Sequence, residues 1–155
     1  MNVIEDLSLS IFQIEFDGDT GIMPRSHISG WLSENLGYLN TLLNTSYSGS
    51  DPSIDLEAQA IYKELYLSHY YRKQSRNALR GIIGGSDGRS DILSLKDGDS
   101  SVTFTNKNEV AKVYKSMADE SQNRLDRLVS QYNIYQSKPL QVGGIEGQLF
   151  TGLLY

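Results

Sequence analysis

Residues 106–133 have the sequence NKNEVAKVYKSMADESQNRLDRLVSQYN, and this stretch decides the fold. Asn106, followed three residues later by Glu109, is typical of a helix amino terminus, because both side chains can bond free amides there. Apolar and small side chains then recur at intervals of three and four, which marks one face of a helix. This face comprises Val110, Tyr114, Met117, Ser121, Leu125, Leu128 and Tyr132, widened by Val113 and Val129. We predict a helix about 40 Å long that needs partner helices, because one apolar face cannot stabilise it alone.

Residues 52–80 predict a second long helix, with Asp51 as its cap and Pro52 at its first position. Its apolar surface covers more than half of the circumference, which predicts contacts on two sides. The stripe comprises Ile54, Ala58, Ile61, Leu65 and His69, with Tyr62, Tyr66 and Tyr70 beside it at four-residue spacing. The three tyrosines suit either a face between subunits or a groove within one chain. The sequence leaves both interpretations open.

The remaining segments complete a mainly α fold. Apolar and polar residues alternate loosely over residues 8–16, which predicts a short strand or an extended arm. Residues 26–43 predict a first helix capped by Ser26, with Trp31 on its apolar face. Residues 92–105 predict a small β-hairpin with a turn at 97–98. We therefore expect a helical domain over residues 1–133, with three helices, the last two long and antiparallel, and the hairpin between these two.

Residues 134–155 form a separate carboxy-terminal segment in this interpretation. The segment contains four glycines, which disfavour a helix, yet it is too apolar for a solvated tail. Its apolar residues are Leu140, Val142, Ile145, Leu149, Phe150, Leu153, Leu154 and Tyr155. We predict an extended arm that docks in the groove or on the sheet edge of another molecule. The alternative is a tail folded over its own core.

Composition narrows the function. The chain of 155 residues carries a net charge of −5, which argues against general nucleic-acid binding but leaves room for a local basic patch. Such a patch is predicted near the end of the second helix, at Arg72, Lys73, Arg76 and Arg80. These cations complement the helix dipole, or they form a collar that faces phosphate or an acidic partner. Cysteine is absent, and no signal peptide or membrane-spanning run is expected.

No pattern predicts catalysis or a cofactor. Asp17 and Asp19 resemble the start of a calcium loop, but Gly21 and Ile28 occupy positions that need ligands, so we expect a turn. The glycine-rich residues 84–90 lack the preceding strand and the closing Gly-Lys-Ser/Thr of a phosphate loop. The two histidines lie in no catalytic motif. We expect no enzyme activity, no metal and no cofactor.

Residues 98–102, Asn106, residues 109–111 and Tyr114, with their order of elements, resemble head–tail connector proteins of tailed bacteriophages. The resemblance covers roughly residues 52–155 and leaves residues 1–50 unmatched. It implies a non-enzymatic adaptor ring, commonly of twelve subunits, bound to the portal protein and to a downstream neck or tail protein. The arm would dock on the portal, the tyrosines would lie between subunits, and the basic cluster would face a channel through which DNA passes without sequence-specific binding.

The same resemblance implies a place in the virion neck, after assembly in the host cytoplasm. Two alternatives remain open at this point. One is another virion protein, such as a stopper or tail-completion protein. The other is a cytoplasmic helical interaction module with a docking tail.

Overall fold

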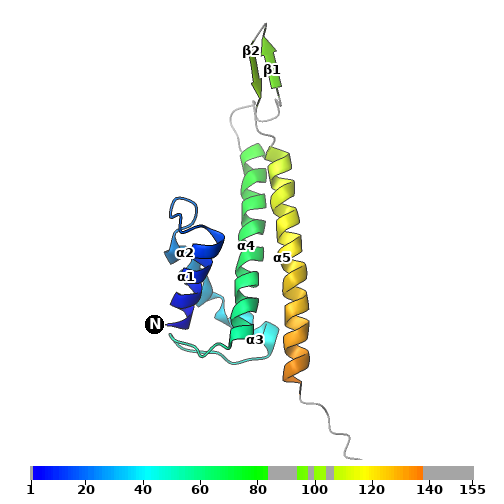
Figure 1. Ribbon diagram of the computed structural model, residues 1–155. Helices are drawn as coiled ribbons and strands as arrows, with labels where there is room; N and C mark the ends of the chain where they lie inside the picture. Colours follow the sequence, from blue (N-terminus) through cyan, green and yellow to red (C-terminus); the bar gives the residue numbers. More distant parts are fainter. Residues whose placement is uncertain (1, 84–93, 98–99, 104–106, 138–155) are drawn as a thin grey trace, which may run out of the picture.

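The computed structural model describes residues 2–83, 94–97, 100–103 and 107–137. This part of the chain is mainly helical, as predicted. The elements in order are α1 (Val3–Glu15), α2 (Arg25–Glu34), α3 (Leu36–Leu43), α4 (Leu56–Ile83), β1 (Ser94–Asp97), β2 (Ser100–Thr103) and α5 (Lys107–Gln136). Figure 1 shows α4 and α5 side by side, α1 and α2 against one flank of α4, and the two strands beyond the far end of the helix pair.

Helices α4 and α5 run in opposite directions, as their side-chain contacts require. The Ser75 hydroxyl donates to the Ala111 carbonyl at 3.0 Å, and the Ser121 hydroxyl donates to the Glu64 carbonyl at 3.2 Å. The buried apolar positions of α5 recur every seven residues, at Ala111, Ala118, Leu125 and Tyr132, and Ser121 is buried between them. A seven-residue repeat is the pattern of coiled-coil packing, and the small alanines and serines allow the two backbones to approach closely.

The predicted buried face of α5 is wrong at two positions of its first half, Val113 and Met117. Val113 is 58% exposed and Met117 is 38% exposed, whereas Ala111 and Ala118 are buried. The helical spacing of the sequence favoured the larger side chains, because they carry more apolar surface. Close helix packing instead places the smallest side chains at the contact.

Residues 8–16 do not form a strand or an extended arm, because almost all of them belong to α1. The helix begins after Asn2, whose side-chain oxygen accepts a hydrogen bond from the Ile4 amide at 2.9 Å. Ile4, Leu7 and Ile11 are buried at helical spacing, and Ile14 is 64% exposed. The alternation of apolar residues within 8–16 was misleading because the helical stripe starts upstream of that window.

The predicted helix over residues 26–43 is two helices, α2 and α3, so the described chain has five helices rather than three. Asn35 ends α2, because its amide and its side-chain nitrogen both donate to the Trp31 carbonyl, at 3.0 Å and 2.9 Å. The cap is Pro24 rather than Ser26, which lies inside the helix. The turn expected at residues 17–21 is present, and the Asp19 carboxylate accepts from the Gly21 amide at 2.7 Å.

Helix α4 begins at Leu56, four residues later than predicted. Asp55 caps it by accepting from the Ala58 amide at 3.0 Å, whereas Asp51 accepts from the Val3 amide at 3.1 Å and so holds α1.

Between α4 and α5 in the chain, β1 pairs antiparallel with β2, with Leu95 opposite Val102. The predicted cap Asn106, Gly98 of the predicted turn at 97–98, and residues 84–93 lie outside the described residues.

The core lies between α4 and the α1–α3 layer, and the three tyrosines are part of it. Tyr62, Tyr66 and Tyr70 are 0%, 3% and 9% exposed. The Tyr62 hydroxyl donates to the Leu32 carbonyl, and the Tyr70 ring meets the Phe16 ring edge-on at 4.9 Å. These tyrosines therefore fill a groove of their own chain, and a face between subunits built on them is not available in this structure.

Candidate functional site

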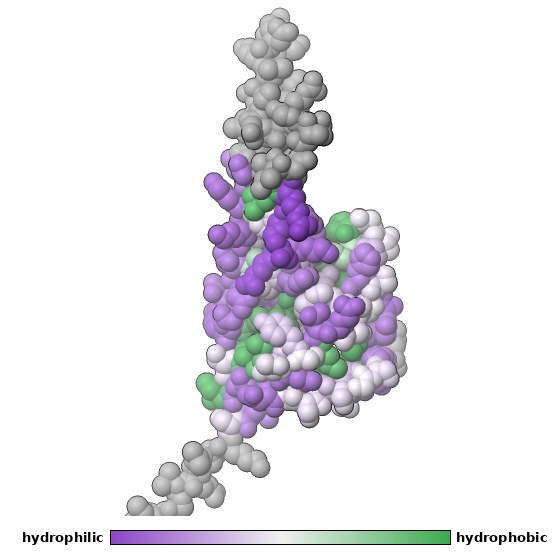
Figure 2. All heavy atoms as spheres, turned by 180° about the vertical axis from the view of Figure 1, so that it is seen from behind, coloured by the Kyte–Doolittle hydropathy of each residue, from purple (hydrophilic) through white to green (hydrophobic). Residues whose placement is uncertain are grey.

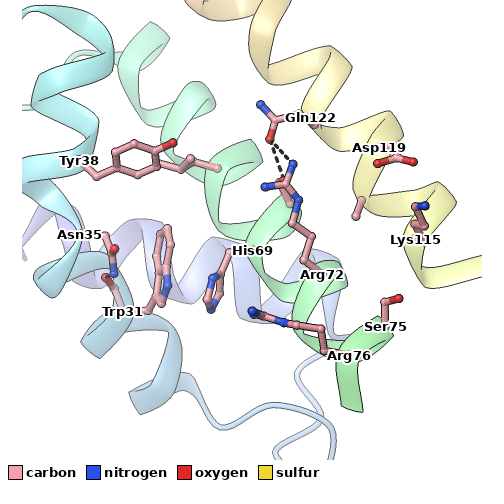
Figure 3. Close-up of a pocket in the computed structure, with 13 residues that line it drawn as sticks. Trp31, Asn35, Tyr38, His69, Arg72, Ser75, Arg76, Lys115, Asp119 and Gln122 are labelled. Carbon is pink, nitrogen blue, oxygen red and sulfur yellow. Dashed lines mark hydrogen bonds between the residues drawn. The ribbon is translucent and has the colours of Figure 1, made fainter. Parts of the chain in front are cut away.

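A cleft of about 510 Å³ lies where α2, α3, α4 and α5 meet (Figure 3). Its volume falls within the range of about 300–1,000 Å³ that is usual for ligand sites. The wall formed by α4 and α5 carries cations, and the wall formed by α2 and α3 carries aromatic rings. The lining side chains that matter for its chemistry are Trp31, Tyr38, His69, Arg72, Arg76, Lys115, Asp119 and Gln122.

The sequence builds this cleft from local features of three segments. His69, Arg72 and Arg76 recur at three- and four-residue spacing and so share one face of α4. The helix break at Asn35 lets α2 and α3 present Trp31 and Tyr38 to the same cleft. The antiparallel pairing of α4 with α5 adds Lys115 from a position distant in the chain.

A chain of hydrogen bonds orients the Arg72 guanidinium. Its Nη2 donates to Gln122 Oε1 at 2.9 Å, and the Ser68 hydroxyl donates to the same oxygen at 3.2 Å. Gln122 is held in turn, because its Nε2 donates to Asp126 Oδ1 at 2.8 Å. Guanidinium has five N–H donors, so Arg72 keeps donors for a ligand while its position is fixed.

The charge of the cleft is opposite to that of the whole chain. Three cations, Arg72, Arg76 and Lys115, face one carboxylate, Asp119. In the described part of the chain, every ion pair to a carboxylate uses Arg25, Lys63 or Arg124, so none uses a cation of the cleft. The cleft is therefore a local positive site on a chain of net charge −5.

His69 and Trp31, which both line the cleft, form a ring pair with centroids 5.1 Å apart and planes tilted by 35°. Burial lowers the pKa of His69 from its ordinary value, and the charges of Lys73 and Arg76 lower it further. The imidazole is therefore neutral at neutral pH. Its partner Trp31 is the only tryptophan of the sequence, so the cleft carries an intrinsic fluorescent reporter.

The two serine hydroxyls that line the cleft are both engaged in hydrogen bonds within the chain. The hydroxyl of Ser68 is bonded to Gln122, and that of Ser75 is bonded to the Ala111 carbonyl. Neither serine therefore has the nucleophile–base contact that covalent catalysis needs. Within the described residues, no group of three histidine, aspartate or glutamate side chains is placed to hold a metal ion.

The predicted basic cluster is exposed on α4, and the structure divides it between two clefts. Arg72 and Arg76 line the site above, whereas Lys73 lines a second cleft of about 320 Å³ together with His27 and Glu34. Arg80 is exposed in the last turns of α4. Figure 2 shows the most hydrophilic side chains gathered at this end of the helix pair.

Sequence reasoning missed Lys115, Trp31 and Tyr38 as parts of this site. Ser75 contacts Ala111, so the residues that follow on α5 lie level with the basic part of α4. No local pattern could give this register. Trp31 was predicted on the apolar face of its helix, and its ring does contact that of Tyr66.

The predicted docking residues, Leu140, Val142, Ile145, Leu149, Phe150, Leu153, Leu154 and Tyr155, lie outside the described residues. The described chain ends beside an apolar hollow of about 530 Å³, lined by Ala60, Ile61, Leu128 and Tyr132 among others. Ile134 and Tyr135, in the last turn of α5, are 69% and 87% exposed. The end of α5 therefore presents apolar surface to solvent.

Comparisons with family models, curated proteins and solved structures found no match to this chain. Among the described helices, none is both long enough and apolar enough to cross a membrane. The fold and the site thus define a mainly helical chain with a cationic, aromatic-lined cleft. Any more specific assignment is a proposal.

Proposed function

We propose that this chain is a structural subunit of a head–tail connector ring of a tailed bacteriophage. In this proposal it docks on the portal protein and lines part of the DNA passage between capsid and tail, without enzymatic activity. The observation that carries the proposal is the division of exposed surface along α4 and α5. Cations lie toward the end next to β1 and β2, and the three most exposed apolar side chains of the two helices, Leu56, Ile134 and Tyr135, lie at the end where the carboxy-terminal segment begins.

The finer architecture of the proposal is a bundle with two long antiparallel helices, a small hairpin between them and an extended arm over residues 134–155. The long helices act as a rigid strut, and the arm supplies the contact with the portal. A ring repeats each arm contact once per subunit, so modest individual contacts give strong attachment. The net negative charge supports passage of DNA without tight binding, because phosphate contacts dominate nucleic-acid affinity.

The proposed contacts between subunits do not use Tyr62, Tyr66 or Tyr70, because these are buried. The exposed apolar residues of the long helices are better candidates. They are Leu56 and Leu79 on α4, and Val113, Met117, Ile134 and Tyr135 on α5. Apolar side chains at such exposure are the kind that an assembly interface covers.

The test is the solution mass of the full chain and of a version that ends at Gln136, alone and mixed with a candidate portal. The connector function predicts a large closed oligomer on the portal that is lost with the arm, while helicity by circular dichroism is kept. A monomer that ignores the portal would contradict it. That result would favour a helical interaction module that uses its tail on a smaller partner.

A further inference from the structure

The cations that line one wall of the cleft repel one another in the free protein. Arg72 and Arg76 are four residues apart on α4, and like charges at this spacing repel each other. Lys115 brings a third positive charge from α5, and Asp119 is the one carboxylate that lines the cleft. With His69 neutral, the lining carries three positive charges and one negative charge. A bound anion would relieve this repulsion.

The opposite wall selects among anions. Tyr38 is 53% exposed, and Trp31 lines the cleft beside it. Figure 3 shows both rings on the side of the cleft opposite Gln122 and Asp119, with Arg72 between the two sides. Aromatic faces stack on nucleobases, and cations next to them bind the phosphate. A bare carboxylate or inorganic phosphate would use the cationic wall and leave the aromatic wall uncovered.

We propose that the cleft between α2, α3, α4 and α5 binds a nucleotide unit. The phosphate contacts Arg72, Arg76 and Lys115, and the base lies against Tyr38 and the open part of Trp31. Arg72 is already positioned by Gln122, so binding costs little side-chain entropy there. The proposal holds whether or not the chain forms a connector ring, because the cleft is complete within one subunit.

Two sources share this chemistry, namely a free mononucleotide and a single-stranded nucleic acid. Trp31 fluorescence reports on both, because it is the only tryptophan and it lines the cleft. The full chain is titrated with adenosine monophosphate, with a twelve-nucleotide oligodeoxythymidine and with inorganic phosphate. Saturable quenching by either nucleotide ligand, much stronger than by phosphate, is the expected result. Tighter binding of the oligonucleotide per nucleotide identifies a strand as the source, and equal binding identifies the free nucleotide.

Variants assign the binding to this cleft. Arg76→Gln and Lys115→Gln remove cleft cations, and each should weaken binding about tenfold or more, as expected for a lost charged hydrogen bond. Tyr38→Ala removes the stacking platform and should weaken binding about fivefold to a hundredfold. The matched control is Lys112→Gln, an exposed cation on α5 that does not line the cleft, and it should bind as the unchanged chain does.

Three results would overturn the proposal. The first is no fluorescence change at millimolar nucleotide. The second is equal affinity for inorganic phosphate or for a glutamate-rich peptide, which would show that the aromatic wall selects nothing. The third is an equal loss of binding in Lys112→Gln and Arg76→Gln, which would mean general charge attraction. Circular dichroism of each variant checks the fold, and portal binding measured separately keeps this test distinct from that of the connector.

Discussion

Replacing Asp55 by alanine should destabilise the chain more than replacing any exposed aspartate. The Asp55 carboxylate caps α4 through the Ala58 amide at 3.0 Å. It also accepts hydrogen bonds from two tyrosine hydroxyls, at 2.9 Å from Tyr132 and 3.2 Å from Tyr47. These contacts join the start of α4, the end of α5 and the loop after α3. One side chain therefore ties three segments together.

The magnitude follows from these contacts. Loss of a helix cap costs about 1 kcal/mol. Tyr132 is 7% exposed, and a buried donor that loses its acceptor costs about 1–3 kcal/mol. The two tyrosine hydroxyls lie 3.2 Å apart and can recover part of this loss by bonding each other. We expect Asp55→Ala to lower the free energy of unfolding by about 2–4 kcal/mol, a large share of the usual 5–15 kcal/mol.

The assay is urea unfolding followed by circular dichroism at neutral pH. Asp6→Ala is the matched control, because Asp6 is an exposed acid in the first turn of α1 and should cost about 1 kcal/mol or less. Tyr132→Phe removes one donor of the network, and its effect should not add to that of Asp55→Ala. A loss below about 1 kcal/mol in Asp55→Ala, or strict additivity in the double variant, would refute the reasoning.

Three further predictions concern packing, pH and backbone conformation. Ala118→Leu should lower the free energy of unfolding in urea by about 1–3 kcal/mol, because Ala118 is 1% exposed between α4 and α5. The control Met117→Leu, at a 38% exposed site, should change it by less than about 0.5 kcal/mol. Burial, followed by the nearby Tyr70, raises the pKa of Tyr66 to about 12, so the folded chain holds this proton more tightly than the unfolded chain. The contribution of this raised pKa to the free energy of unfolding is complete below pH 10 and is lost as the pH rises toward 12. Tyr66→Phe should reduce this alkaline loss of stability, which denaturant titrations at several pH values would measure. Asn44 has a φ of 51°, so Asn44→Val should lower the thermal midpoint, with a cost of about 1–2 kcal/mol, whereas Asn44→Gly should retain it.

The helical class of this chain could be predicted because it rests on local signals. Long runs without glycine or proline, with apolar residues at helical spacing, favour helix whatever the partners are. The boundaries were harder, because they depend on which of several polar residues finds a partner. Asp51 and Asp55 are both good caps by type, and the structure uses Asp55 for α4 because Asp51 is engaged with Val3 of α1.

Burial depends on partners that a single helix does not reveal. Tyr62, Tyr66 and Tyr70 of α4 are residues typical of an interface between subunits, but the surface they pack against belongs to the same chain, at Phe16 after α1 and at Trp31 of α2. The prediction of residues 8–16 as a short strand or an extended arm removed this partner from consideration. Recognition of α1 as a helix would have left less apolar surface on α4 to explain.

The basic end of the α4–α5 pair is the feature that helix chemistry explains least. A helix dipole acts on the last turn, so it accounts for Arg80 near the end of α4 at Ile83, but not for Arg72 or Arg76 further back. The antiparallel register then places Lys112 and Lys115 of α5 at the same end. These lysines lie near the positive end of the α5 dipole, which does not stabilise cations.

Such a gathering of like charge lowers the stability of the free protein, and in the described ion pairs no carboxylate compensates for it. Features that cost stability persist where function needs them. An anionic partner at this end of the molecule would account for the gathering of cations, which helix capping and packing do not require. The two proposals name different anionic partners, namely a nucleotide bound in the cleft and DNA that passes through the connector channel. The first predicts binding that depends on Arg76 but not on Lys112, whereas the second predicts a similar dependence on both.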